Sequence, residues 1–151
     1  MATRGNIGIL NADGSVTGIY THWDSYPANN GRILVEHYKD TAKIKSLVDL
    51  GSISSLHEKV EPTTKKHSFE SPEEGVTVAY HRDRGEAWEH TKPNTFKNKE
   101  EFVKQMEEFA YLWDGKKWLV TTSHTGIKGI PKGKFVDLDE KAFKGAEDIG
   151  Y

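Results

Sequence analysis

Two Asp-Gly pairs, each lying between segments of alternating apolar and polar residues, constrain the fold of this chain most strongly. Asp114-Gly115 lies at the centre of 111–122, and Asp13-Gly14 separates 6–10 from 16–23. An Asp-Gly pair supplies the positive-φ position that a tight hairpin turn needs. The sequence therefore predicts two β-hairpins, whose strands pair antiparallel.

Between the hairpins, apolar residues recur at helical spacing in two stretches. One helix is predicted from Arg32 onward, and a second follows a cap at 40–41 and ends at Gly51. His37 shares the apolar face of the first helix, so we expect a hydrogen-bonded core histidine rather than a ligand. Residues 52–56 are predicted to form one further turn.

The clearest helix is predicted over 99–110. Asn98 and Glu101 resemble a capping box at its start. Phe102 and the large apolar residues that follow it recur at helical spacing, which indicates one buried and one solvated face.

The remaining segments complete an α+β fold. Residues 75–80 and 135–138 are predicted strands, 139–144 a short helix and 57–75 a mobile surface loop. Because the strands come in hairpins, we expect an antiparallel sheet with two or three helices packed on one face. The length of 151 residues indicates a single domain, 1–151.

Composition excludes several classes of function. The chain has no cysteine, so a disulfide framework, a Cys-zinc site and a thiol nucleophile are impossible. A formal net charge of −2 argues against a nucleic-acid partner. No apolar run approaches the ~20 residues of a membrane span, and no signal peptide is present, so we expect a cytoplasmic protein without a membrane partner. The P-loop and dinucleotide motifs are absent, and we assign no cofactor and no metal.

The first candidate site follows the strand that begins at Val16. If the strand continued, His22, Asp24 and Tyr26 would share one face and Trp23 would point to the other. A histidine beside a carboxylate can act as a general base or ligate a divalent metal. The alternative is structural: Asp24 caps the following loop, His22 bonds to nearby backbone and Trp23 fills the core.

The second candidate site follows the strand at 75–80. His81 and Asp83 share one parity, and Arg82 and Arg84 share the other. Two arginines can grip a phosphate or carboxylate through bidentate contacts. The alternative is an exposed hairpin end whose charges pair with one another. If the two strand ends meet, His22, Asp24, His81 and Asp83 would lie in one pocket.

The block 22–27 (His-Trp-Asp-Ser-Tyr-Pro), within 9–38, resembles a family of small uncharacterised proteins encoded by tailed bacteriophages and some bacteria. The block 80–86 is similar to a second stretch shared by that family. The resemblance implies a phage accessory protein that works in the host cytoplasm, and it implies no catalytic residue.

These features leave three hypotheses for function. The favoured one is a protein that binds a host protein or an anionic small molecule, with a counter-defence role as one form of such binding. The alternative is a hydrolase or phosphoesterase that uses His22 and His81 with Asp24 and Asp83, in a metal-dependent or metal-free form. The third is a structural or interaction module with Trp23 and Tyr26 in its core. Oligomeric state and enzymatic activity stay open.

Overall fold

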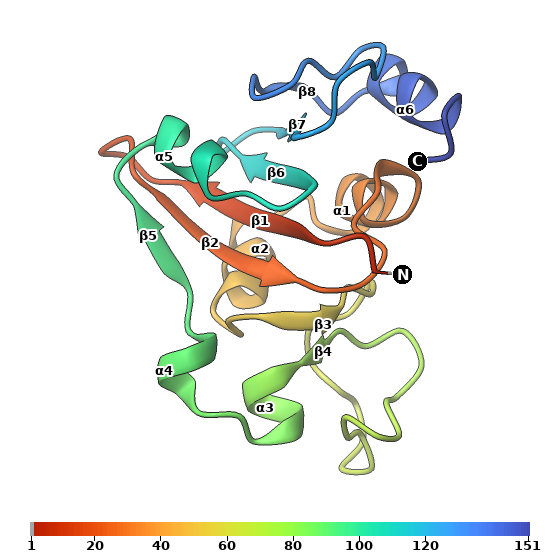
Figure 1. The fold of residues 1–151 in the computed structure, drawn as a ribbon. Helices are drawn as coiled ribbons and strands as arrows, with labels where there is room; N and C mark the ends of the chain where they lie inside the picture. The colour runs from red at the N-terminus through yellow and green to blue at the C-terminus, as the bar shows by residue number, and fades with distance from the viewer. Residues whose placement is uncertain (1) are drawn as a thin grey trace.

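The computed structural model describes residues 2–151 and shows an α+β fold built on one mixed sheet. In the described part of the chain the strands are β1 (Gly5–Leu10), β2 (Val16–Thr21), β3 (Ile53–Ser55), β4 (Val78–Ala79), β5 (Asn94–Phe96), β6 (Phe109–Trp113), β7 (Trp118–Thr122) and β8 (Val136–Asp137). Their order is β4-β3-β2-β1-β6-β7-β8, and β5 pairs with the first part of β2 (Figure 1).

The helices are short and lie between or beside the strands. They are the π-helix η1 (Pro27–Gly31) and the α-helices α1 (Arg32–His37), α2 (Thr41–Val48), α3 (Tyr80–Arg84), α4 (Trp88–Thr91), α5 (Lys99–Lys104) and α6 (Glu140–Glu147). The segment at the C-terminal end of the chain returns to the rest of the fold, since the Ala28 N–H donates to the oxygen of Tyr151.

Both predicted hairpins are confirmed. β1 pairs antiparallel with β2 and β6 with β7. Gly14 and Gly115 adopt φ values of 89° and 101° at the two turns, in the region that disfavours a side chain. The side chain of Asp114 stabilises the second turn by accepting from the N–H groups of Lys116 and Lys117.

The prediction of a purely antiparallel sheet is wrong, because the central neighbours β1 and β6 run parallel, as do β2 and β3. Ile7 lies beside Tyr111 in the first of these pairs, and Thr21 beside Ile53 in the second. Such pairings join segments far apart in the sequence, so no local turn signal can predict them.

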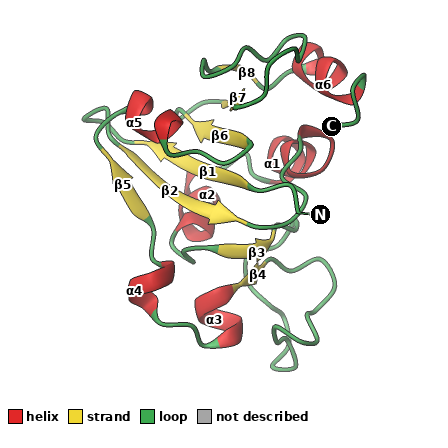
Figure 2. Cartoon of the chain, viewed as in Figure 1, coloured by secondary structure: helices red, strands yellow, loops and turns green. Residues whose placement is uncertain are grey.

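Helices also cover both faces of the sheet, rather than one as predicted (Figure 2). The main core cluster joins one face to Leu34 of α1, Ile44 of α2 and Phe143 of α6. A smaller cluster on the other face is built around Phe102 of α5. Each face therefore has its own buried layer.

The smaller layer depends on two glycines paired across β1 and β2. Gly8 lies opposite Gly18 in the hairpin. A Cβ at Gly18 would lie 2.9 Å from the ring of Phe102, and one at Gly8 would lie 3.1 Å from it. Without side chains at these positions, the Phe102 ring can rest directly on the sheet and hold α5 there.

Two segments predicted to be helical differ in the structure: one helix ends early, and the other segment is a strand. The helix predicted over 99–110 ends at Lys104, because 109–113 forms β6 beside β1 in the core. The turn predicted over 52–56 is β3 instead, since Ile53 pairs with both neighbouring strands. In both cases long-range pairing overrides the local pattern.

The structure also bears on the predicted helix caps, on His37 and on the strand predicted over 75–80. Asp40 caps α2 by accepting from the Lys43 N–H, as expected. His37 is 40% exposed rather than part of the core. The strand predicted over 75–80 is limited to β4, because Tyr80 already begins α3. Asn98 caps α5 by accepting from the Glu101 N–H, as the capping box predicts, and the helix predicted over 139–144 is α6, which begins one residue later and extends to Glu147.

Residues 57–75 form an irregular segment, as predicted, and its mobility stays a prediction. Its backbone is tied down at several points: Lys59 bridges to Val76, and Glu73 accepts from the N–H groups of Thr63 and Thr64. Among residues 2–151, no helix is both long enough and apolar enough to cross a membrane.

Candidate functional site

The first predicted site lies where β2 gives way to a loop beside β3. β2 ends at Thr21, and the His22 and Trp23 N–H groups donate to the backbone of β3. The His22 Nδ1 atom lies 2.7 Å from the Tyr20 hydroxyl, and its ring meets Trp23 edge-on at 4.6 Å between centroids. Trp23 is 44% exposed, so it does not fill the core.

Asp24 turns the chain away from this surface. Its φ of 55° places it in the left-handed region, which an aspartate tolerates better than most residues. Tyr26 then packs against the main core cluster. A shared face for His22, Asp24 and Tyr26 required the strand to continue through them, and β2 ends at Thr21, so this condition is not met.

In the second predicted site, Arg82 binds the protein itself. Its guanidinium donates four hydrogen bonds: one each to the backbone oxygens of Val60 and Thr77, and two to the carboxylate of Asp83. An arginine has five N–H donors. Little of this side chain is left to bind an anion, and its contacts hold 57–75 against α3.

Asp83 lies at the centre of a buried polar network. It accepts from the Ala79 N–H at 2.7 Å, and its Oδ2 lies 3.1 Å from His67 Nε2. The other nitrogen of His67 accepts from the Glu73 N–H. Burial alone would raise the pKa of Asp83, but the hydrogen bonds from Arg82 and Ala79, together with the nearby His67 ring, outweigh it and lower the pKa.

The remaining members of the second site also contact neighbours in the chain. His81 Nδ1 lies 2.7 Å from the Glu86 oxygen, with its ring 5.0 Å from that of Trp88. Arg84 forms an ion pair with Glu86 and lies over the ring of Phe69. The two arginines thus do not converge, and the charges pair with one another, though in a helix rather than at a hairpin end.

No hydrogen bond or ion pair within 2–151 joins the two predicted sites. β3 lies between β2 and β4, and the side chains at the two strand ends turn to different partners. Among residues 2–151, no hydrogen bond or ion pair links His22 or Asp24 to His81 or Asp83, and no group of three or more His, Asp or Glu side chains is placed to hold a metal ion. Ligand binding at either strand end stays a prediction.

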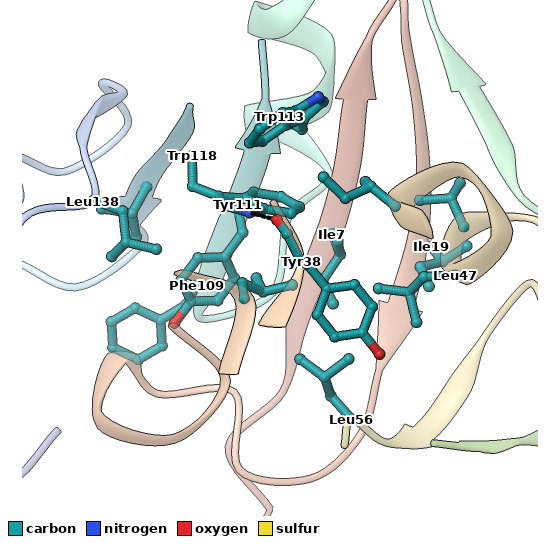
Figure 3. Packing of buried hydrophobic residues seen from close by; sticks show 14 of the residues in the cluster. Ile7, Ile19, Tyr38, Leu47, Leu56, Phe109, Tyr111, Trp113, Trp118 and Leu138 are labelled. Atoms are coloured by element: carbon teal, nitrogen blue, oxygen red, sulfur yellow. Dashed lines mark hydrogen bonds between the residues drawn. The ribbon is translucent and has the colours of Figure 1, made fainter. Parts of the chain in front are cut away.

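A cavity of about 440 Å³, here called the indole pocket, lies between α1 and the tip of the β6–β7 hairpin. Its inner wall is apolar and is formed by Val35, Tyr38, Trp113, Trp118 and Leu138. Figure 3 shows four of these, Tyr38, Trp113, Trp118 and Leu138, packed in the main core. Its rim is exposed and charged and is formed by Lys39, Lys116, Lys117, Asp137 and Asp139. A small apolar cavity with a few polar groups at its edge is the usual form of a ligand site.

The polar atoms of the inner wall are already satisfied by the protein. The indole nitrogens of Trp113 and Trp118 donate to the Thr41 hydroxyl at 3.0 Å and to the Tyr38 backbone oxygen at 2.8 Å. The Tyr38 hydroxyl donates to the His57 oxygen, and burial raises its pKa to about 12. The wall therefore offers carbon surface to a ligand.

The rim carries more free cationic than free anionic groups. Asp139 caps α6 by accepting from the Ala142 N–H, and Asp137 pairs with Lys117 at 2.8 Å. The hydrogen bond and charge of Asp137 raise the pKa of Lys117. No carboxylate in 2–151 lies within ion-pairing distance of Lys39 or Lys116. An anionic group at this rim would therefore find two ammonium partners.

A second cavity, of about 520 Å³, has the opposite character. It lies beside 72–75 and is lined by Glu58, Glu73 and Glu74 together with His37 and His57. His37 Nε2 lies 3.7 Å from a Glu58 oxygen. Its carboxylates would repel an anion, so the indole pocket is the better anion site.

Most of the indole pocket lies beyond local sequence reasoning. Trp113 and Trp118 flank the Asp114-Gly115 turn, and their ring centroids lie 5.4 Å apart across the hairpin. The available signal was the pair of lysines at 116–117 between two tryptophans. Lys39 and Leu138 come from distant segments, so their place in the pocket depends on the fold.

Comparison of this chain with protein-family models, with curated proteins and with solved structures finds no match.

Proposed function

We propose that this chain is a binding protein that holds an anionic small molecule in the indole pocket. The observation that carries the proposal is the combination, in one cavity, of a carbon-lined inner wall and two ammonium groups, those of Lys39 and Lys116, that have no carboxylate of 2–151 within ion-pairing distance. The strand ends lack this combination, because Arg82 and Asp83 bind the protein itself.

The size and lining of the pocket support a small ligand with an apolar body. A volume of about 440 Å³ lies within the range of about 300–1,000 Å³ typical of ligand sites. Trp113, Trp118 and Leu138 are each at least 93% buried, so their positions are fixed before a ligand arrives. A preformed wall lowers the ordering cost of binding.

The charges at the rim support an anionic head group. Lys39 follows α1 and Lys116 lies in the β6–β7 turn, so two separate elements bring ammonium groups to the same opening. A ligand with its ring inside and its anion outside would use both parts of the cavity. Both lysines are exposed, so their contribution is expected to fall as salt concentration rises.

The experiment is a titration followed by 15N NMR with three probes. 1-Naphthyl phosphate carries both a ring and an anion, 1-naphthol carries the ring alone, and inorganic phosphate carries the anion alone. We expect 1-naphthyl phosphate to shift the indole N–H signals of Trp113 and Trp118 at lower concentration than either partial probe. Lys116→Glu should weaken this binding by about fivefold, and Lys65→Glu, the same change on an exposed lysine in 57–75, should not.

Other results would redirect the assignment. Shifts confined to the signals of His22 and Trp23 would place the ligand at the first strand end. Release of 1-naphthol, lost in His22→Ala or His81→Ala, would favour the phosphoesterase alternative. Absence of any shift would reject the small-molecule proposal and direct the search to a host-protein partner.

A further inference from the structure

The ion pair between Lys117 and Asp137 lies at the rim of the indole pocket. Lys117 Nζ lies 2.8 Å from Asp137 Oδ1, and both residues line the cavity. Backbone pairing holds β7 and β8 together, since Asp137 lies beside Leu119 and the Leu138 N–H donates to the Trp118 oxygen. The fold therefore delivers a carboxylate to the rim at a fixed position.

Asp137 differs from the other carboxylates near this rim. Asp139 caps α6, and Asp114 accepts from the backbone of the β6–β7 turn. The carboxylate of Asp137 has Lys117 as its one recorded partner in 2–151 and accepts from no backbone group. Neither a helix nor a turn depends on its side chain.

We infer that Asp137 is an intramolecular competitor of the ligand, occupying Lys117 until the anionic group of the ligand takes its place. This inference rests on the function proposed above. The side chains of Lys117 and Asp137 are 55% and 54% exposed. Ion pairs so exposed to solvent are weak, so a ligand can displace this one at little cost.

Competition of this kind selects for the charge of the ligand. A monoanion that binds Lys39 or Lys116 leaves the Lys117–Asp137 ion pair in place, and one that binds Lys117 only replaces the charge of Asp137. A phosphate monoester carries about −1.5 to −2 charges at pH 7 and can reach Lys39 or Lys116 as well. The ligand class favoured by this rim is therefore an apolar or aromatic phosphate monoester rather than a monocarboxylate.

The test measures the dissociation constants of 1-naphthyl phosphate and 1-naphthoate for the wild type, Asp137→Asn and Asp148→Asn. Asp148 is exposed and lies just beyond α6, so Asp148→Asn makes the same change of net charge away from the pocket. We expect the wild type to prefer the phosphate. Asp137→Asn should tighten binding of 1-naphthyl phosphate about threefold to fivefold, and Asp148→Asn should leave it within twofold.

A double variant locates the effect. If Asp137 acts through Lys117, Asp137→Asn should no longer tighten the binding of 1-naphthyl phosphate when Lys117 is already glutamine. The Lys117→Gln/Asp137→Asn double variant should then bind the probe as Lys117→Gln alone does. A wild type that binds the probe while Asp137→Asn binds it equally or more weakly would overturn the inference and leave the proposed function standing. If neither protein binds either probe, the proposed function fails and the inference fails with it.

Discussion

The indole nitrogen of Trp118 donates a hydrogen bond to the backbone oxygen of Tyr38 at 2.8 Å. This contact ties the β6–β7 hairpin to the residue that follows α1, and Trp113 makes a parallel contact with Thr41 at the start of α2. The inner wall of the indole pocket is thus held by the packing of the main core. Mutations that loosen this wall should affect stability and ligand binding together.

Replacing Trp118 with phenylalanine should destabilise the protein by about 2–3 kcal/mol. The change leaves the Tyr38 oxygen buried without its donor and removes part of a ring that is 5% exposed. Trp23→Phe is the matched control, because the ring of Trp23 is 44% exposed. Urea unfolding, monitored by circular dichroism, measures the free energy of unfolding of both variants. Equal losses of stability in Trp118→Phe and Trp23→Phe would contradict the structural role of Trp118.

Gly145→Ala should destabilise α6, although alanine usually favours a helix over glycine. A Cβ at Gly145 would lie 1.5 Å from the backbone oxygen of Lys128, so the helix would have to move away from the loop it packs on. We expect a loss of about 1–3 kcal/mol. Lys144→Ala, on the exposed side of α6, should change stability by less than about 0.5 kcal/mol. A stabilised Gly145→Ala variant would show that the close approach is absent.

Asp83→Asn should lower stability at pH 7 by about 3 kcal/mol, because the partners of the carboxylate lose its negative charge and one of its two acceptor oxygens. The folded protein lowers the pKa of Asp83 from its ordinary value of 3.8. The resulting stabilisation is present above pH 3.8 and is lost as pH falls through the folded pKa. The difference in free energy of unfolding between the wild type and Asp83→Asn should therefore shrink as the pH falls below 3.8. Urea unfolding from pH 7 to pH 3 measures it, and a difference independent of pH would argue against this network.

Asp24→Gly should retain the stability of the wild type within about 0.5 kcal/mol, whereas Asp24→Ala should lose about 1 kcal/mol. The reason is the φ of 55° at Asp24, which glycine adopts freely and alanine does not. Thermal unfolding gives the stabilities. Both variants should bind 1-naphthyl phosphate as the wild type does, and a loss of binding in Asp24→Gly would show that the Asp24 carboxylate takes part in ligand binding.

Local signals predicted much of the fold and little of the candidate site. Turn and cap residues act over a few positions, so Asp114-Gly115 and Asp40 could be interpreted from the sequence alone. Ile53 and Phe109 could not, because their strands form only when distant partners pair with them. The interpretation of the strand-end motifs assumed extended backbone where the chain turns or becomes helical. The indole pocket depends on α1, the β6–β7 hairpin and β8 together.

The parallel pairing of β1 with β6 also bears on how this chain folds. Gly5 lies beside Phe109, so the two middle strands of the sheet meet only after a loop that includes most of the other elements has closed. Closure of long loops slows folding, and an unpaired strand edge can recruit another chain meanwhile. On the ribosome, the β1–β2 hairpin must wait with its β6-facing edge open until β6 has been synthesised. Aggregation during expression should therefore depend on this edge, and a chaperone that shields it should raise the yield of folded protein.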